Sequence, residues 1–191
     1  MKSIITSAFA FAVSTTVAFG WTLDSDASAI SYVSIKNADT AEPNLLPGLT
    51  GTVSDDGAAE IDIALSSVET YIDIRNERMQ EHLFKTETHP VAKLLAQLDM
   101  ANFTDMAAGQ TKDVEFPVTL QANGQEATYD VLAAVTRVGE DRVVVASRQP
   151  VIVYADELGY MDGLATLQDI AGLESIQITV PVSFTLVFDN S

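Results

Sequence analysis

The chain has 191 residues, no cysteine, and 27 acidic against 10 basic residues, which gives a formal net charge of −17. Without cysteine there are neither disulfides nor thiol nucleophiles, so the hydrophobic core alone must hold the fold. The strong negative charge excludes binding to nucleic acid or to an anionic membrane by electrostatic attraction. The length fits one domain with a full core.

The first 20 residues are typical of a cleaved signal peptide. Lys2 provides a positive start, and an apolar run from Ile4 to Phe19 follows. This run is shorter than the roughly 20 residues that span a bilayer. Small residues allow cleavage after Gly20 or, alternatively, after Ala18. Removal of residues 1–20 leaves one domain, 21–191, with nine basic and 27 acidic residues and a net charge of −18. We therefore expect export to the periplasm.

Alternation of apolar and polar residues predicts strands in the first part of the mature chain. The expected strands are Ala29–Lys36, Leu49–Ser54 and Ala59–Leu65. Asp55-Asp56-Gly57 has the composition of a turn between the last two strands. The segment from Asn37 to Pro47 contains two prolines, so we expect a loop there.

A helical insertion interrupts this strand pattern. The charged run Arg75-Asn76-Glu77-Arg78-Met79 begins it, and Met79, Leu83 and Phe84 recur at helical spacing. Pro90 ends the insertion because proline cannot continue a helix. The spacing of Leu164, Leu167 and Ile170 predicts a second helix, which Asp162 could cap and Gly172 ends.

The rest of the chain again shows strand patterns. The expected strands are Val91–Phe103, Lys112–Gln121, Gln125–Val138, Arg142–Tyr154 and Ile176–Phe188. Asn123-Gly124 is a strong signal for a hairpin between the second and third of these. Pro117 and Pro181 interrupt two strand patterns, which places them at sheet edges or bulges. Such a succession of strands is typical of an antiparallel barrel or sandwich.

The insertion and its flanks resemble the YceI-like family of secreted bacterial lipid- and polyisoprenoid-binding proteins. The family pattern reads Ser-hydrophobic-x-Thr, then Arg-Asp-x-His-Leu, an aromatic pair and a proline. Here Ser67–Thr70 matches the first part and Arg75–Met79 falls on the second, with Asn, Arg and Met for Asp, His and Leu. Leu83-Phe84 falls on the aromatic pair and Pro90 on the proline.

The resemblance extends to both ends of the mature chain. Trp21–Asp24 and Ser28–Lys36 resemble the opening strand of the family, and Ile176–Phe188 resembles the closing strand. The resemblance implies an all-β fold, a single antiparallel lipocalin-like β-barrel of about eight strands with two short helical insertions. An eight-stranded barrel is wide enough for side chains or one slender ligand.

We expect the inward rows of several strands to line a cavity for a linear apolar ligand. The candidate ligand-binding residues are Ile61, Ile63, Leu65, Phe84, Phe116, Val118, Val180, Val182 and Phe184, with Arg75 and Arg78 at the mouth. Each apolar residue could equally belong to an ordinary filled core. The arginines could contact a ligand head group or form helix ion pairs, Arg78 with Glu81. Trp21 is expected to plug one end of the barrel.

The sequence offers no catalytic constellation. His82 and His89 are the only imidazoles, and no Gly-x-Ser-x-Gly elbow is present. Asp55-Asp56-Gly57 lacks the spaced ligands of a calcium loop. We therefore expect neither an enzyme nor a metal site or cofactor.

The predicted function is a periplasmic carrier that holds a polyisoprenoid or prenyl-quinone-type lipid inside its barrel, without catalysis. Its partner would be the apolar ligand, with no nucleic acid and no stable membrane insertion. The alternative is a filled-barrel structural or interaction protein that acts through its acidic surface or a membrane redox partner. The sequence is also compatible with a homodimer in which two copies pair edge to edge.

Overall fold

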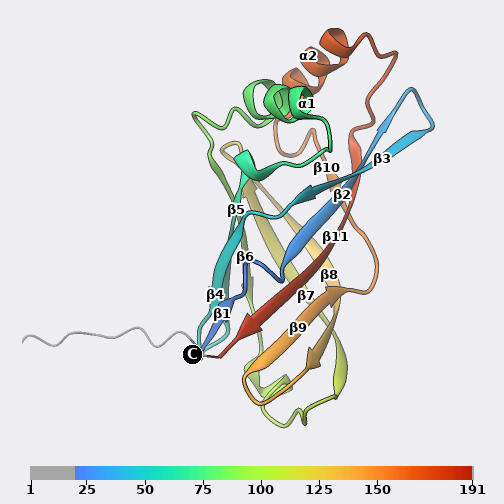
Figure 1. Ribbon diagram of the computed structural model, residues 1–191. Coiled ribbons are helices and arrows are strands. Elements are labelled where there is room, and N and C mark those ends of the chain that lie inside the picture. Colours follow the sequence, from blue (N-terminus) through green and yellow to red (C-terminus); the bar gives the residue numbers. More distant parts are fainter. Residues whose placement is uncertain (1–19, 191) are drawn as a thin grey trace, which may run out of the picture.

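The computed structural model describes residues 20–190, which form one β-barrel with helices at one end (Figure 1). Except for Gly20, the predicted signal peptide lies outside the described residues. The strands are β1 (Trp21–Leu23), β2 (Ala29–Lys36), β3 (Thr40–Leu46), β4 (Leu49–Val53), β5 (Ala58–Ala64), β6 (Val91–Gln97), β7 (Thr111–Ala122), β8 (Gln125–Arg137), β9 (Arg142–Ser147), β10 (Val151–Tyr154) and β11 (Thr179–Asp189). The helices are η1 (Leu65–Ser67), α1 (Asp73–Arg78), η2 (Met79–Phe84), η3 (Met100–Asn102) and α2 (Met161–Ala171).

The sheet closes on itself, and all of its pairings are antiparallel. The pairings run β1–β4–β5–β6–β7–β8–β9–β11, and β11 pairs again with β1. Strand β11 also pairs with β2 and β10, so β1 with β2 and β9 with β10 each act as one interrupted barrel strand. Strands β3 and β4 likewise form one interrupted barrel strand, in which β3 pairs with β2 and β4 pairs with β1. The result is a closed eight-stranded antiparallel barrel, which confirms the predicted fold class.

The segment from Asn37 to Pro47 is mostly strand, so the prediction of a loop there was wrong. Strand β3 pairs with β2 along its whole length, from Thr40 opposite Lys36 to Leu46 opposite Ile30. Asn37 and Ala38 have positive φ angles of 50° and 71°, which reverse the chain. Pro43 is tolerated because β3 is an edge of the sheet path, where a missing N–H breaks no ladder.

Two predicted strands are shorter than expected. The stretch from Arg142 to Tyr154 breaks after Ser147 into β9 and β10. Strand β6 ends at Gln97, and the Asp99 side chain then accepts a 3.1 Å hydrogen bond from the Ala101 N–H at the start of η3. Strand β9 ends at the polar stretch Arg148-Gln149-Pro150, whereas β6 ends although the apolar residues Leu98 and Met100 follow, so alternation alone does not locate the end of β6.

The two strand prolines lie where one side of the strand is unpaired, as predicted. Strand β7 pairs with β6 only at residues 119–121, so Pro117 lies beyond that ladder. Strand β11 pairs with β2 only from Val182 onward, so Pro181 also lies outside that pairing. A missing N–H on an unpaired side leaves the ladder intact.

A helical cap, formed by α1, η2 and α2, covers one end of the barrel (Figure 1). Helix α2 approaches η2 closely at Gly163, where a Cβ atom would lie 2.7 Å from the His82 carbonyl oxygen. Gly172 ends α2 with a φ of 62°, as predicted. Asp162 does not cap the helix, since the N-cap is Tyr160; its carboxylate instead stands in the first turn, where it favours the positive helix end.

Candidate ligand-binding cavity

The barrel encloses a cavity of about 600 Å³ with a wall of mostly apolar side chains. Alternate residues of each strand face it because side chains in a strand point to opposite sides. On β11 these are Val180, Val182, Phe184, Leu186 and Phe188. The volume lies within the range of typical small-molecule sites, roughly 300–1,000 Å³. The barrel is therefore not filled by its own side chains, contrary to what the alternative function assumes.

Nine of the eleven predicted ligand-binding residues lie on the cavity wall. They are Ile61, Ile63, Leu65, Phe84, Phe116, Val118, Val180, Val182 and Phe184. Their contact with a ligand stays a prediction. Arg75 and Arg78 do not line the cavity.

The capped end of the cavity is closed by apolar and aromatic residues. Met79, Leu83 and Phe84 of η2 are buried and face the cavity. Phe84 packs edge to face against Tyr160, with ring centroids 5.8 Å apart and an interplanar angle of 81°. The π-helical form of η2 brings Leu83 and Phe84, adjacent in sequence, both into the core. Such π-helical turns are often found at functional sites.

The opposite end of the cavity, which we call the far end, carries polar side chains. Asp55, Thr104, Arg137 and Asn190 join the wall there. The Arg137 guanidinium carbon lies 5.8 Å from the ring centroid of Trp21. Its Nε donates to the Gly139 carbonyl oxygen at 3.1 Å, and its Nη2 donates to the Glu140 carbonyl oxygen. Trp21 thus lies at one barrel end, as predicted, and the wall cation is Arg137 rather than Arg75 or Arg78.

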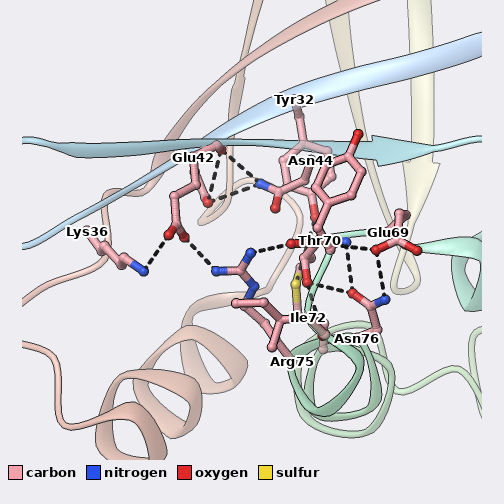
Figure 2. A network of polar contacts seen from close by, with 12 residues as sticks. Tyr32, Lys36, Glu42, Asn44, Glu69, Thr70, Ile72, Arg75 and Asn76 are labelled. Carbon is pink, nitrogen blue, oxygen red and sulfur yellow. Dashed lines mark hydrogen bonds and ion pairs between the residues drawn. The ribbon is translucent and has the colours of Figure 1, made fainter.

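Arg75 is instead part of a polar network beside the cap (Figure 2). Its Nη1 lies 2.6 Å from Oε2 of Glu42, and its Nη2 donates to the Thr70 carbonyl oxygen. The other carboxylate oxygen of Glu42 lies 2.9 Å from Lys36 Nζ. The hydrogen bond from Lys36, together with the charge of Arg75, holds the pKa of Glu42 below its usual value. Arg75 therefore ties the β2–β3 hairpin to the loop before α1.

The sequence motif shared with the family supports this loop. Asn76 Oδ1 accepts hydrogen bonds from the Thr70 N–H at 2.8 Å and the Thr70 hydroxyl at 2.6 Å, and Thr70 is only 1% exposed. Asn76 Nδ2 donates to Glu69 Oε1 at 3.2 Å. Ser67 Oγ accepts from the Gly48 N–H and donates to the Ala64 carbonyl oxygen. These polar motif residues hold the cap in place, and Ser67, Thr70 and Asn76 do not line the cavity.

Beside the network, Tyr32 lies opposite Asn44 in the β2–β3 ladder (Figure 2). Its ring lines the cavity wall, and its hydroxyl donates to the Met79 sulfur at 3.8 Å. Burial raises the pKa of Tyr32 well above its usual value, so the hydroxyl stays neutral. The tyrosine presents a weakly bonded hydroxyl at a mostly apolar end, which Tyr160 also lines. Its inward position follows the alternation of Ile30, Tyr32 and Ser34, a signal present in the sequence but not followed there.

Residues 20–190 contain neither a candidate metal site nor a membrane-spanning helix. No group of histidine and carboxylate side chains in this part of the chain could hold a metal ion. No helix there is long and apolar enough to cross a bilayer. His82 lies 3.7 Å from Glu81, and no ion pair joins Arg78 to Glu81 in this region.

Comparison with known proteins agrees with the barrel. A domain of Saccharophagus degradans, described as a polyisoprenoid binding domain implicated in plant cell wall breakdown, is 33% identical with a TM-score of 0.88. The match covers 91% of this chain and 99% of that one. BcnA of Burkholderia cenocepacia has the same fold at 17% identity and a TM-score of 0.63, over 86% and 98% of the two chains. The curated proteins give no match.

The sequence pattern of the YceI-like domain matches residues 21–188, which is nearly all of the described chain. The matched region includes the helical cap and all of the barrel strands except Asp189, the last residue of β11. The chain therefore belongs to the YceI-like family.

Proposed function

We propose that the protein is a periplasmic carrier that holds a polyisoprenoid or prenyl-quinone-type lipid in its barrel without catalysis. The observation that carries the proposal is the apolar cavity of about 600 Å³, enclosed by strands from the whole chain. The related domain from Saccharophagus degradans, described as polyisoprenoid-binding, supports the ligand class. The apolar leader with its small residues before Trp21 supports export.

The cavity can supply useful affinity without polar contacts. Burying one CH₂ group contributes roughly 0.8 kcal/mol, so a five-carbon isoprene unit contributes about 3–4 kcal/mol before ordering costs. Two or three such units would offset the loss of translational and rotational freedom on binding. Such a site selects by length and width, and it tolerates related prenyl lipids.

Lipid analysis of the purified protein tests the proposal. The protein would be expressed with its leader, purified from the periplasmic fraction, extracted with organic solvent and analysed by mass spectrometry. We expect a prenyl lipid at near-stoichiometric amounts, and less of it in Val182→Phe, which narrows the cavity. A parent protein that contains no lipid and binds no added prenyl quinone would refute the carrier function. Recovery in the cytoplasmic fraction would refute export.

A further inference from the structure

The helical cap exposes apolar side chains that its own fold leaves uncovered. Tyr71 is 68% exposed, Ile72 47% and Ile74 51%. Within residues 20–190, nine large hydrophobic side chains are exposed; Ile74 lies on α1, Tyr71 and Ile72 lie directly before it, and Met161 and Ile170 lie on α2. Exposed apolar side chains gathered at one place usually mark an interaction site. We call Tyr71, Ile72 and Ile74 the cap face.

The backbone beneath the cap face is held firmly. Tyr71 has a φ of 62°, a left-handed conformation that is uncommon for a bulky residue. Its N–H donates to the Glu69 carboxylate, and the preceding Thr70 is buried and bonded to Asn76. Arg75 holds the same loop through the Thr70 carbonyl oxygen, as Figure 2 shows. The loop thus presents Tyr71 to solvent in a fixed, unfavourable conformation, which is typical of functional sites.

The charge near the cap face favours an electrically neutral partner. Segment 71–89 carries three basic and four acidic residues, a net charge of −1, and α2 adds Asp162 and Asp169, whereas the whole chain carries −17. Most of the negative charge therefore lies elsewhere in the chain. A zwitterionic lipid surface would meet little repulsion at this segment, while anionic lipids would be repelled by the protein as a whole.

We propose that the cap face docks the protein transiently onto a zwitterionic lipid bilayer, with Tyr71, Ile72 and Ile74 entering the interfacial layer. The inference rests on the proposed carriage of a prenyl lipid, because such a cargo must pass between a membrane and the cavity. The cap face lies on the segment whose next turn, η2, lines the cavity through Met79, Leu83 and Phe84. Docking there would bring the capped end of the cavity to the lipid and spare the cargo a passage through water.

Flotation of the lipid-free protein with vesicles tests the docking. The vesicles are phosphatidylcholine alone or phosphatidylcholine mixed with phosphatidylglycerol. The variant Ile72→Ser/Ile74→Ser removes two cap-face side chains, and Val138→Ser is the control. Val138 is 54% exposed in the β8–β9 turn at the opposite end of the barrel. Far-UV circular dichroism and a urea titration verify that each variant is folded.

We expect the parent and Val138→Ser to float with phosphatidylcholine vesicles, and the double variant to bind them roughly 30-fold less. Phosphatidylglycerol should weaken the association of the parent. A parent that does not float, or a double variant that floats like the parent, would overturn the proposal. Binding that needs phosphatidylglycerol, or a dimer of the parent that the double substitution abolishes without vesicle binding, would overturn it in favour of another partner.

A separate titration with a water-soluble short-chain prenyl quinone distinguishes this inference from the proposed function. The cap-face side chains do not line the cavity, so the double variant should bind the quinone as the parent does. Loss of flotation with retained quinone binding supports docking. Failure of all three proteins to bind the quinone refutes the carrier function, whatever the flotation shows.

Discussion

Replacing Val182 by phenylalanine should weaken ligand binding without destabilising the fold. Val182 lies in β11 opposite Tyr32 and Val151, lines the cavity, and is only partly buried although it belongs to the barrel wall. Phenylalanine adds four carbon atoms on the cavity side. Since the space is empty, burying the larger ring should stabilise the lipid-free protein by about 1–2 kcal/mol. In a filled core, the same substitution would instead cost about 1–3 kcal/mol.

The effect on binding has the opposite sign. The added carbons displace a comparable length of ligand, which removes about 3 kcal/mol of burial at roughly 0.8 kcal/mol per CH₂. This corresponds to an increase in Kd of about 100- to 200-fold. The matched control is Val187→Phe, the same exchange on the same strand. Val187 is 5% exposed and is not on the cavity wall. Overpacking there should destabilise the protein by about 1–3 kcal/mol and leave binding unchanged.

Urea unfolding of the lipid-free proteins and fluorescence titration with a short-chain prenyl quinone measure the two quantities. The reasoning is refuted if Val182→Phe loses as much stability as Val187→Phe while its Kd equals that of the parent. That result would mean that the barrel interior is packed in solution. A raised Kd in both variants would mean that the substitutions act through the fold and not through the cavity.

Three further substitutions test the polar network and the cap. Glu42→Gln should lower the free energy of unfolding by about 1 kcal/mol at pH 7. Because the pKa of Glu42 in the folded protein lies below its ordinary 4.5, the difference between the two proteins should vanish as the pH falls through that pKa. Thermal unfolding measured from pH 7 to 3 would show this. Asn76→Asp should place a carboxylate against Glu69 and cost about 1–3 kcal/mol in urea unfolding at pH 7, and less at pH 4. Gly163→Ala should lift α2, since the new Cβ would meet the backbone of η2 at 2.7 and 2.9 Å; faster amide exchange in α2 would show this, and unchanged exchange would contradict it.

The barrel itself was predictable because strands that line an interior alternate, and long alternation survives in the sequence. Phe116 and Val118 on one strand and Val180, Val182 and Phe184 on another were read correctly as facing inward. Whether these faces enclose a cavity or fill it was not predictable. The same residues can do either, and the difference lies in how far apart opposite walls stand.

The errors fall where local chemistry and tertiary pairing disagree. Pro43 argues against a strand, but β3 is an edge of the sheet path and tolerates it. Arg75 lies in a motif that was expected near the mouth of the cavity, which favoured a contact with the ligand head group. Its partners are instead Thr70, 5 residues away, and Glu42, 33 residues away. The ion pair with Glu42 depends on the β2–β3 hairpin, which the sequence pattern did not predict. Arg137 gave no such signal, since it ends a strand beside an ordinary turn.

The last prediction concerns which arginine a polar head group meets. Arg75 is held by Glu42 and Thr70, so a ligand could engage it only by breaking contacts that anchor the cap. Arg137 already stands on the cavity wall over Trp21, and among residues 20–190 its Nη1 donates no hydrogen bond. Arg137→Met should therefore weaken binding of a prenyl quinone by about tenfold, one hydrogen bond to a charged donor, and spare a prenyl hydrocarbon without a head group. Arg75→Met should lower the urea midpoint and change the two affinities equally. If Arg75→Met alone discriminates between quinone and hydrocarbon, the head group lies at the cap, and the polar far end serves the fold.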